Sequence, residues 1–349
     1  MNKILAISLS IVLSFLIAFL LGFVVIPWLR KLHFGQTILD IGPAWHKSKQ
    51  GTPTMGGFMF IISTILVFVG IVVTDHLLGG HLFESGAFIE DNVKIKLIAG
   101  LVMAFGFGLI GFADDYIKVV KKRNLGLTIA QKSIAQILLM LGYLGTLYMS
   151  GNTYMIVPFF DKVDLGSGFM GILFWIFGMI VMYATVNAVN FTDGVDGLCA
   201  SVTSIAAIAF LIAACLKGMF GVSILAGSLL GGCLGYLIWN WNPSKVMMGD
   251  TGSMFLGGMV VALAYAIDCP LIILCFGFIY VIEMLSDVIQ IAYFKATHGK
   301  RIFKMAPIHH HFELCGWKEK KIVIIFSLVN ALFCVLGLVL LYFGSIRVA

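Results

Sequence analysis

The feature that most constrains this sequence is a series of long apolar stretches without Asp, Glu, Lys or Arg. About 20 consecutive apolar residues are enough to cross the hydrocarbon core of a bilayer. Such stretches cover 4–29, 52–74, 97–113, 133–160, 165–192, 197–216, 218–244, 251–267 and 322–346. A tenth, about 270–294, is apolar apart from Glu283 and Asp287. The sequence predicts an all-α integral membrane protein with about ten transmembrane helices, forming one polytopic domain over residues 1–349.

Composition supports this prediction. Of the 349 residues, 60% are hydrophobic and 11% are charged, whereas a soluble domain carries about 25% charged residues. The first apolar stretch is too long for a secretory signal and lacks a small-residue cleavage site, so we expect it to be retained. The seven cysteines contain no CxxC pair, which argues against a zinc site and against a disulfide framework.

The distribution of positive charge predicts the orientation in the membrane. With ten spans, the loops 30–51, 114–132, 193–196, 245–250 and 295–321 share one side and hold 17 of the 23 Lys and Arg residues. Loops rich in Lys and Arg face the cytoplasm, so both termini should lie outside. The net charge of +6 is then mostly a topology signal, and no nucleic-acid partner is indicated. The unusual polar clusters all fall in these loops, which predicts an active-site cleft on the cytoplasmic face.

The first polar cluster ends the third span. Asp114 and Asp115 precede Lys118 by four and three residues, so a continuing helix would bring the lysine close to both carboxylates. The structural alternative is a helix end that reaches water, with the lysine extended toward the interface. Acidic residues at membrane depth are costly, at about 2.5–3.5 kcal/mol on insertion scales. We therefore favour a functional pair.

The second cluster is Asn190, Asp193 and Asp196. A spacing of three residues would place these side chains on one helical face. One of them could cap a helix, but three such groups exceed what a cap needs.

The third cluster runs from Asn240 to Asp250 and Ser253. Asp250 could cap the next span. A helix start with a glycine-rich entry is equally a ready phosphate site.

The most basic loop contains His309, His310 and His311. Three consecutive residues cannot all face one way on a helix, so a three-histidine metal site is disfavoured, and donation to phosphate oxygens fits better. The GTPTMGG segment at 51–57 lacks the GK[ST] ending of a P-loop. Glu283 and Asp287 receive no chemical assignment from the sequence.

Five segments, taken in order, resemble one family. They are GTPTMGG, DDYIK, NAVNFTDGVDGL, MMGDTGS and RIFKMAPIHHHFELCGW. Together they resemble the phospho-N-acetylmuramoyl-pentapeptide transferases, a branch of the polyprenyl-phosphate sugar-1-phosphate transferases. The resemblance covers essentially the whole chain, and MAPIHHHFE is its most branch-specific part. It implies an enzyme of the bacterial plasma membrane.

The resemblance implies a reaction and its partners. Undecaprenyl phosphate would attack the sugar-linked phosphate of UDP-MurNAc-pentapeptide, which gives lipid I and UMP for peptidoglycan synthesis. Substrate and carrier would meet at the lipid bilayer, with Mg²⁺ as the cofactor. The oligomeric state is left open, with a homodimer as one alternative.

The resemblance also implies residue roles. Asp114 and Asp115 would form the catalytic acidic pair, and Asp250 would bind the metal. The same catalytic cleft would contain Lys118, Asp193 and the three histidines. Substrate-binding positions would be Lys49, Asn190, Asp196, Asn240 and Ser253, of which Lys49, Asp196 and Asn240 match positions associated with uridine. Relatives often have Phe at the position of Met247, which puts a stacking contact with uracil in doubt.

Mg²⁺ prefers carboxylates and phosphates in a partly hydrated shell, which agrees with these roles. Two other classes fit the sequence less well. An intramembrane prenyltransferase would want DDxxD motifs, whereas this chain has DDxxK and DxxD. A transporter predicts charges near the midplane and related halves, and no internal repeat is evident.

Overall fold

The computed structural model describes residues 2–32, 51–80, 93–121, 125–166 and 168–346. In order, its long helices are α1 (Lys3–Lys31), α2 (Phe58–Leu77), α3 (Val93–Val120), α4 (Ile129–Met149), α5 (Gly168–Thr192), α6 (Leu198–Leu216), α7 (Phe220–Asn240), α8 (Gly249–Ala266), α10 (Phe278–Ala296) and α12 (Glu319–Leu341). The shorter elements are β1 (Tyr154–Val157), β2 (Phe160–Asp164), η2 (Pro270–Ile272), α9 (Ile273–Phe276), α11 (Ile308–Leu314) and η3 (Tyr342–Ile346).

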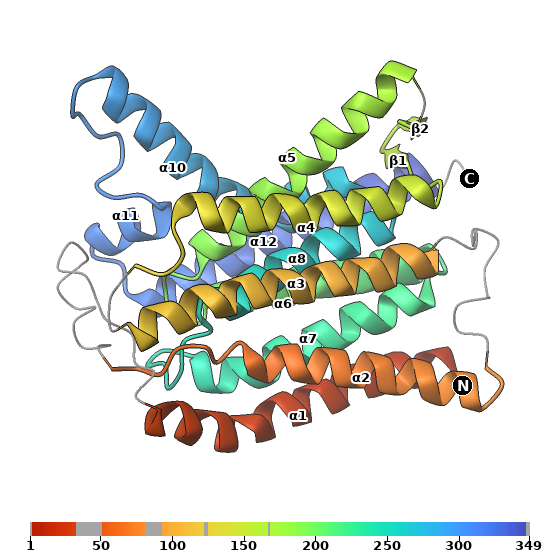
Figure 1. Cartoon of the computed structure of the whole chain (residues 1–349), viewed down its shortest axis with the longest axis horizontal. Helices are drawn as coiled ribbons and strands as arrows, with labels where there is room; N and C mark the ends of the chain where they lie inside the picture. The colour runs from red at the N-terminus through yellow and green to blue at the C-terminus, as the bar shows by residue number, and fades with distance from the viewer. Residues whose placement is uncertain (1, 33–50, 81–92, 122–124, 167, 347–349) are drawn as a thin grey trace.

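Most long helices lie side by side along the long axis of the molecule (Figure 1), while α5 and α10 splay away from the bundle in different directions. The two ends of the described chain lie at one end of the bundle, and α11 lies at the other. This agrees with the prediction that both termini share one side.

Helix α8 forms the centre of the bundle. Every residue from Thr251 to Ala266 is buried. A Cβ atom added at Gly257 would lie 2.7 Å from the Cα atom of Val186 on α5, and one at Gly258 would lie 2.7 Å from the Cα atom of Ala104 on α3. Small residues let helix backbones approach closely where the hydrophobic effect provides little drive for association. The glycines of α8 therefore allow it to pack against several neighbours.

The outer surface of the bundle is apolar, as a lipid-facing surface must be. Large hydrophobic side chains are exposed on several helices, including Ile4, Leu138, Phe169 and Leu332. Seven of the described helices are long and apolar enough to cross a membrane, and the bent pair formed by Pro270–Phe276 and Phe278–Ala296 makes an eighth. The prediction of an all-α, multi-pass membrane protein is confirmed.

Each of the ten expected spans contains a helix, but α4 and α8 are not among the helices that are long and apolar enough to cross a membrane. Helix α4 has 21 residues and contains Lys132 and Gln136, and α8 has 18 residues and opens with Asp250. Because α8 is enclosed by other helices, it needs no lipid-compatible surface. Burial by protein explains why its composition differs from that of the outer helices.

The charge-free stretch 133–160 does not form one helix. Helix α4 ends at Met149, and the remainder enters an antiparallel hairpin in which Tyr154 pairs with Asp164. Gly151, with φ of +72°, adopts a left-handed conformation after the helix that glycine accepts without steric cost. The helix expected over this stretch therefore ends at Met149, and a short hairpin follows it.

The expected span at 270–294 is broken, with a bend of 87° between α9 and α10. The break falls at Gly277, and Asn330 of α12 bonds to both sides of it. The Asn330 side chain accepts from the Ile279 N–H group at 3.2 Å and donates to the Phe276 carbonyl at 3.0 Å. Non-helical backbone at membrane depth is tolerated where other groups satisfy it. The buried Asn330 provides those bonds.

The predicted orientation can be tested with a membrane-impermeant thiol reagent. Cys315 is exposed at the α11 end of the bundle, and His76 is exposed near the end of α2 at the opposite end. In right-side-out membrane vesicles, we expect a His76→Cys, Cys315→Ser variant to be labelled more strongly than Cys315→Ser, and the parent to be labelled no more strongly than Cys315→Ser. Permeabilised vesicles should label both proteins. Labelling of Cys315 alone in sealed vesicles would reverse the orientation.

Candidate active site

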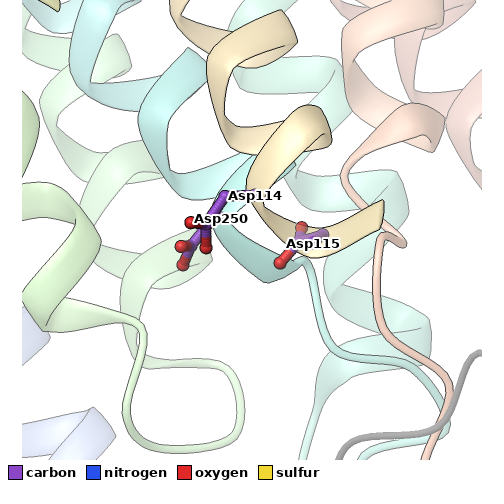
Figure 2. A group of neighbouring side chains, drawn as sticks. All are labelled: Asp114, Asp115 and Asp250. Carbon is purple, nitrogen blue, oxygen red and sulfur yellow. The ribbon is translucent and has the colours of Figure 1, made fainter. Parts of the chain in front are cut away.

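Three carboxylates from two helices meet at the end of the bundle that lies opposite the termini. Asp114 and Asp115 lie near the end of α3, and Asp250 lies in the first turn of α8. One oxygen from each lies within 4.8 Å of the others, and Figure 2 shows the three side chains grouped between the two helix ends. The packing of α3 against α8 therefore brings together residues 136 positions apart in the chain.

Two lysines neutralise part of this negative charge. The Nζ atom of Lys118 lies 2.6 Å from Asp114 Oδ2, 3.1 Å from Asp250 Oδ2 and 3.9 Å from Asp115 Oδ1. Lys132, near the start of α4, lies 2.9 Å from Asp250 Oδ2. The expected pairing of Lys118 with both aspartates of its own helix is confirmed. Lys132 was not predicted, since its only signal was a basic residue at a span boundary.

Asp115 and Asp114 accept hydrogen bonds from different parts of the structure. The Oδ2 atom of Asp115 accepts hydrogen bonds from the backbone N–H of Thr251 at 2.9 Å and from its hydroxyl at 2.7 Å. Asp115 thus caps the first turn of α8 from a neighbouring helix, satisfying an amide that the helix itself leaves unpaired. Asp114 instead accepts from the Leu127 N–H group at 2.8 Å, through Oδ1.

Asn190 ties α5 to the same centre. Its Nδ2 atom donates to Asp250 Oδ1 at 2.9 Å and to the Ser253 hydroxyl at 2.8 Å. Of the positions expected to bind substrate, Asn190 and Ser253 therefore lie directly against the acidic cluster. Asp250 accepts from Asn190 and pairs with both lysines, so residues of three other helices, α3, α4 and α5, contact it.

Asn190, Asp193 and Asp196 do not share one helical face, and that prediction was wrong. Helix α5 ends at Thr192, and a turn follows in which the Asp193 N–H group donates to the Asn190 carbonyl at 3.2 Å. Gly197 then takes a φ of +80°, which favours glycine. The chain therefore leaves α5 before Asp196, so the helical spacing no longer applies.

Asp196 and Asn240 join a second polar network. The Oδ2 atom of Asp196 accepts from Asn242 at 3.1 Å and from the Ser244 N–H group at 3.0 Å. Asn240 accepts from the Gly197 N–H group at 3.0 Å and donates to the Val246 carbonyl at 2.9 Å. Both side chains are buried. They shape the α5–α6 and α7–α8 loops, a role that sequence reasoning missed.

The three histidines of α11 point to different partners, as their consecutive positions require. His309 is fully buried, and its Nδ1 atom lies 3.0 Å from Glu283 Oε2. The Nδ1 atom of His310 lies 2.6 Å from Glu313 Oε2. His311 accepts from the Lys304 N–H group through Nδ1 at 3.1 Å.

The GTPTMGG segment supports the loop that carries Asp250. The Met247 N–H group donates to the Pro53 carbonyl at 2.8 Å, and the Gly56 N–H group donates to the Met247 carbonyl at 2.8 Å. This motif therefore braces the entry to α8 through its backbone. The expected contribution of Lys49 lies outside the described residues.

The donor set of the acidic cluster fits a hard divalent cation. Carboxylate oxygens are the protein ligands that Mg²⁺ prefers, and Asp114, Asp115 and Asp250 bring three carboxylates to one point. Adjacent carboxylates repel one another unless a cation or a proton lies between them. The two lysines supply part of that positive charge, and the cluster can accept more.

Comparison with known proteins agrees with this geometry. Residues 97–268 match the family model described as glycosyl transferase family 4. The phospho-N-acetylmuramoyl-pentapeptide-transferases of Bacillus thuringiensis (strain Al Hakam) and Bacillus cereus (strain AH187) are each 43% identical to the chain over 322 residues. The match covers 90% of this chain and 91% of each relative.

The chain belongs to the phospho-N-acetylmuramoyl-pentapeptide transferase family.

Membership in this transferase family confirms the resemblance drawn from the five motifs and the prediction of a membrane-bound transferase enzyme. The residues matched by the glycosyl transferase model include both the α3 and the α8 part of the acidic cluster. The histidines of α11 lie beyond the residues that this model matches.

The close approach of α3 to α8 predicts a sharp difference between two glycine substitutions. A Cβ atom at Gly111 would lie 2.1 Å from the Asp250 carbonyl oxygen, whereas one at Gly142 on α4 would meet no atom within 4 Å. Overpacking of this kind costs about 1–3 kcal/mol. We expect Gly111→Ala to lower both the midpoint of thermal unfolding in detergent and the transferase activity. Gly142→Ala should leave both unchanged, and equal effects of the two would contradict the packing.

Proposed function

We propose that the enzyme transfers phospho-MurNAc-pentapeptide from UDP-MurNAc-pentapeptide to undecaprenyl phosphate, forming lipid I and UMP in a Mg²⁺-dependent reaction. The observation that carries this proposal is the cluster of Asp114, Asp115 and Asp250 at one end of a membrane-embedded bundle, in a chain of this transferase family. The MAPIHHHFE segment supports the choice of sugar.

The chemistry of phosphoryl transfer suits such a cluster. Catalysis depends on positioning the reacting groups and on neutralising charge on the phosphate oxygens. We assign Mg²⁺ binding to Asp250, with the neighbouring carboxylates close enough to share it. When bound, Mg²⁺ would neutralise negative charge on the diphosphate of the nucleotide sugar.

Asp114 is the better candidate for orienting or deprotonating the lipid phosphate. Asp115 is committed to the first turn of α8 through two hydrogen bonds to Thr251, which would make its movement toward a substrate costly. Asp114 has one backbone donor and one lysine partner. Lys118 and Lys132 offset the carboxylate charge and would contact phosphate oxygens once substrate enters.

The remaining proposed site residues surround this centre. Asp193 and the α11 histidines would bind the donor, with His310 and His311 near its phosphates. Asp196, Asn240 and Lys49 are proposed for the uridine, the first two through the loops that they hold in shape. The acceptor carries a polyprenyl tail, so a site at the end of membrane helices lets its phosphate reach the carboxylates while the tail stays in lipid. We place this site at the cytoplasmic face.

The metal assignment predicts the behaviour of Asp250→Asn. The amide keeps nearly the same shape but loses the charge that holds the cation, so turnover should fall severely and more Mg²⁺ should be needed. The measurement is UMP release across a range of Mg²⁺ concentrations, with thermal unfolding as the folding check. Asp164→Asn, at the other end of the bundle, is the matched control. A folded Asp250→Asn enzyme with the parent's rate and Mg²⁺ dependence would show that Asp250 does not bind the metal.

The same assay tests Asp114. Loss of a proton acceptor typically costs about 10²–10⁴-fold in rate, so Asp114→Asn should also be severe. Its Mg²⁺ requirement should change less than that of Asp250→Asn, because we assign Asp114 to the lipid phosphate. If Asp114→Asn instead shifts the Mg²⁺ requirement more than Asp250→Asn does, Asp114 would be the metal ligand and Asp250 the residue that contacts the lipid phosphate.

The substrate assignment predicts strong selectivity. With polyprenyl phosphate and Mg²⁺, we expect the enzyme to turn over UDP-MurNAc-pentapeptide far faster than UDP-GlcNAc, with UMP as the nucleotide product. Radiolabelled sugar transferred to the lipid phase measures the rate. Comparable rates with both sugars would place the enzyme in the broader sugar-phosphate transferase class, and release of diphosphate would favour prenyl transfer.

A further inference from the structure

Glu283 is a buried carboxylate that the proposed chemistry does not use. It lies on α10, which contributes no residue to the acidic cluster, and its side chain is fully buried. An acidic residue within a membrane span is expensive and usually marks a functional position. Its partner is His309 of α11, also fully buried, at 3.0 Å between Oε2 and Nδ1.

The bond to Glu283 decides which nitrogen of His309 remains available. A neutral imidazole carries one N–H group and one lone pair. In a neutral imidazole beside an ionised carboxylate, the proton lies on the nitrogen that faces the carboxylate, here Nδ1, and Nε2 keeps the lone pair. The same Oε2 atom lies 3.5 Å from the His309 backbone nitrogen, so Glu283 contacts both the ring and the start of α11.

Two polar atoms of this pair have no hydrogen-bond partner among the described residues. They are Nε2 of His309 and Oε1 of Glu283, and both are buried. Leaving a buried polar atom unpaired costs about 1–3 kcal/mol. Such atoms in a folded protein call for an explanation, and a role in catalysis or ligand binding is a common one.

The free Nε2 atom faces the loop that leaves α5. A Cβ atom added at Gly194 would lie 2.1 Å from Nε2, so only glycine leaves room for the ring at this point. Four residues earlier, Asn190 donates to Asp250. The imidazole therefore meets the same short segment whose other end contacts the acidic cluster.

We propose that Glu283 is a positioning residue for the transferase. It holds His309 through Nδ1, so that Nε2 lies at the Gly194 loop as an acceptor for a hydroxyl or amide N–H group of the nucleotide sugar. The proposal rests on the proposed function, since it names the group that orients one of the donor-binding side chains. A purely structural role, in which Glu283 only links α10 to α11, is the competing explanation.

Size-matched variants separate the two explanations. Glu283→Gln keeps an oxygen that can accept from Nδ1, whereas Glu283→Leu fills a similar volume without an acceptor. We expect Glu283→Leu to weaken the binding of UDP-MurNAc-pentapeptide by roughly 10- to 100-fold, the range seen when carboxylates behind metal-bound histidines are removed. Glu283→Gln should retain most of the affinity. Asp287→Asn, one turn further along α10, is the control for loss of a nearby carboxylate.

A double-mutant cycle tests whether Glu283 acts through His309. Calorimetric binding of UDP-MurNAc-pentapeptide is compared for the parent, Glu283→Leu, His309→Ala and the double variant. If Glu283 acts through the imidazole, Glu283→Leu should cause no further loss once His309 is absent. An equal loss in both backgrounds would assign Glu283 a structural role and overturn the proposal.

A spectroscopic test needs no substrate. In ¹⁵N-histidine-labelled enzyme at alkaline pH, with the His309 signals identified from His309→Ala, we expect Nδ1 to be protonated and Nε2 to be unprotonated. Glu283→Leu should remove this preference, and Asp287→Asn should keep it. Identical His309 signals in the parent and Glu283→Leu would overturn the proposal. If the parent fails to bind UDP-MurNAc-pentapeptide while the tautomer behaves as expected, the proposed substrate is wrong and the positioning remains.

Discussion

The backbone contact between α3 and α8 is the constraint on which the rest of the site depends. Gly111 has no Cβ atom, so the Asp250 carbonyl can approach α3 more closely than any side chain would permit. This approach lets Asp115 reach the amide and the hydroxyl of Thr251. Three carboxylates then gather at one point, and Lys118 and Lys132 counter their mutual repulsion. A wider separation of the two helices would move the carboxylates of α3 away from Asp250.

Polar side chains inside the membrane serve the fold as well as the chemistry. Asn330 satisfies the backbone groups freed where α9 meets α10, which allows a sharp bend without unpaired amides. The bend directs α10 away from the bundle (Figure 1), and Glu283 on that helix meets His309 of α11. The bent span thus determines where the histidine segment can lie.

Much of the site was accessible from the sequence because its motifs combine unusual residues with short spacings. The contact of Lys118 with the aspartates of its own helix follows from positions three and four residues apart. Lys132 and Thr251 could not be found in this way, because their partners lie 118 and 136 positions away. The shared face expected for Asn190 and Asp196 failed because α5 ends between them.

The sequence by itself determined the class of fold, the family and the positions of the helices, because charge-free stretches of sufficient length have few stable alternatives in a bilayer. It also determined which residues carry charge at the helix ends. Only the tertiary structure decided which of these charges meet, that the span at 270–294 is bent, and that Glu283 belongs with His309. Hydrophobicity fixes which segments are buried in lipid, whereas the register between helices depends on close contacts, such as that at Gly111, between residues far apart in the chain.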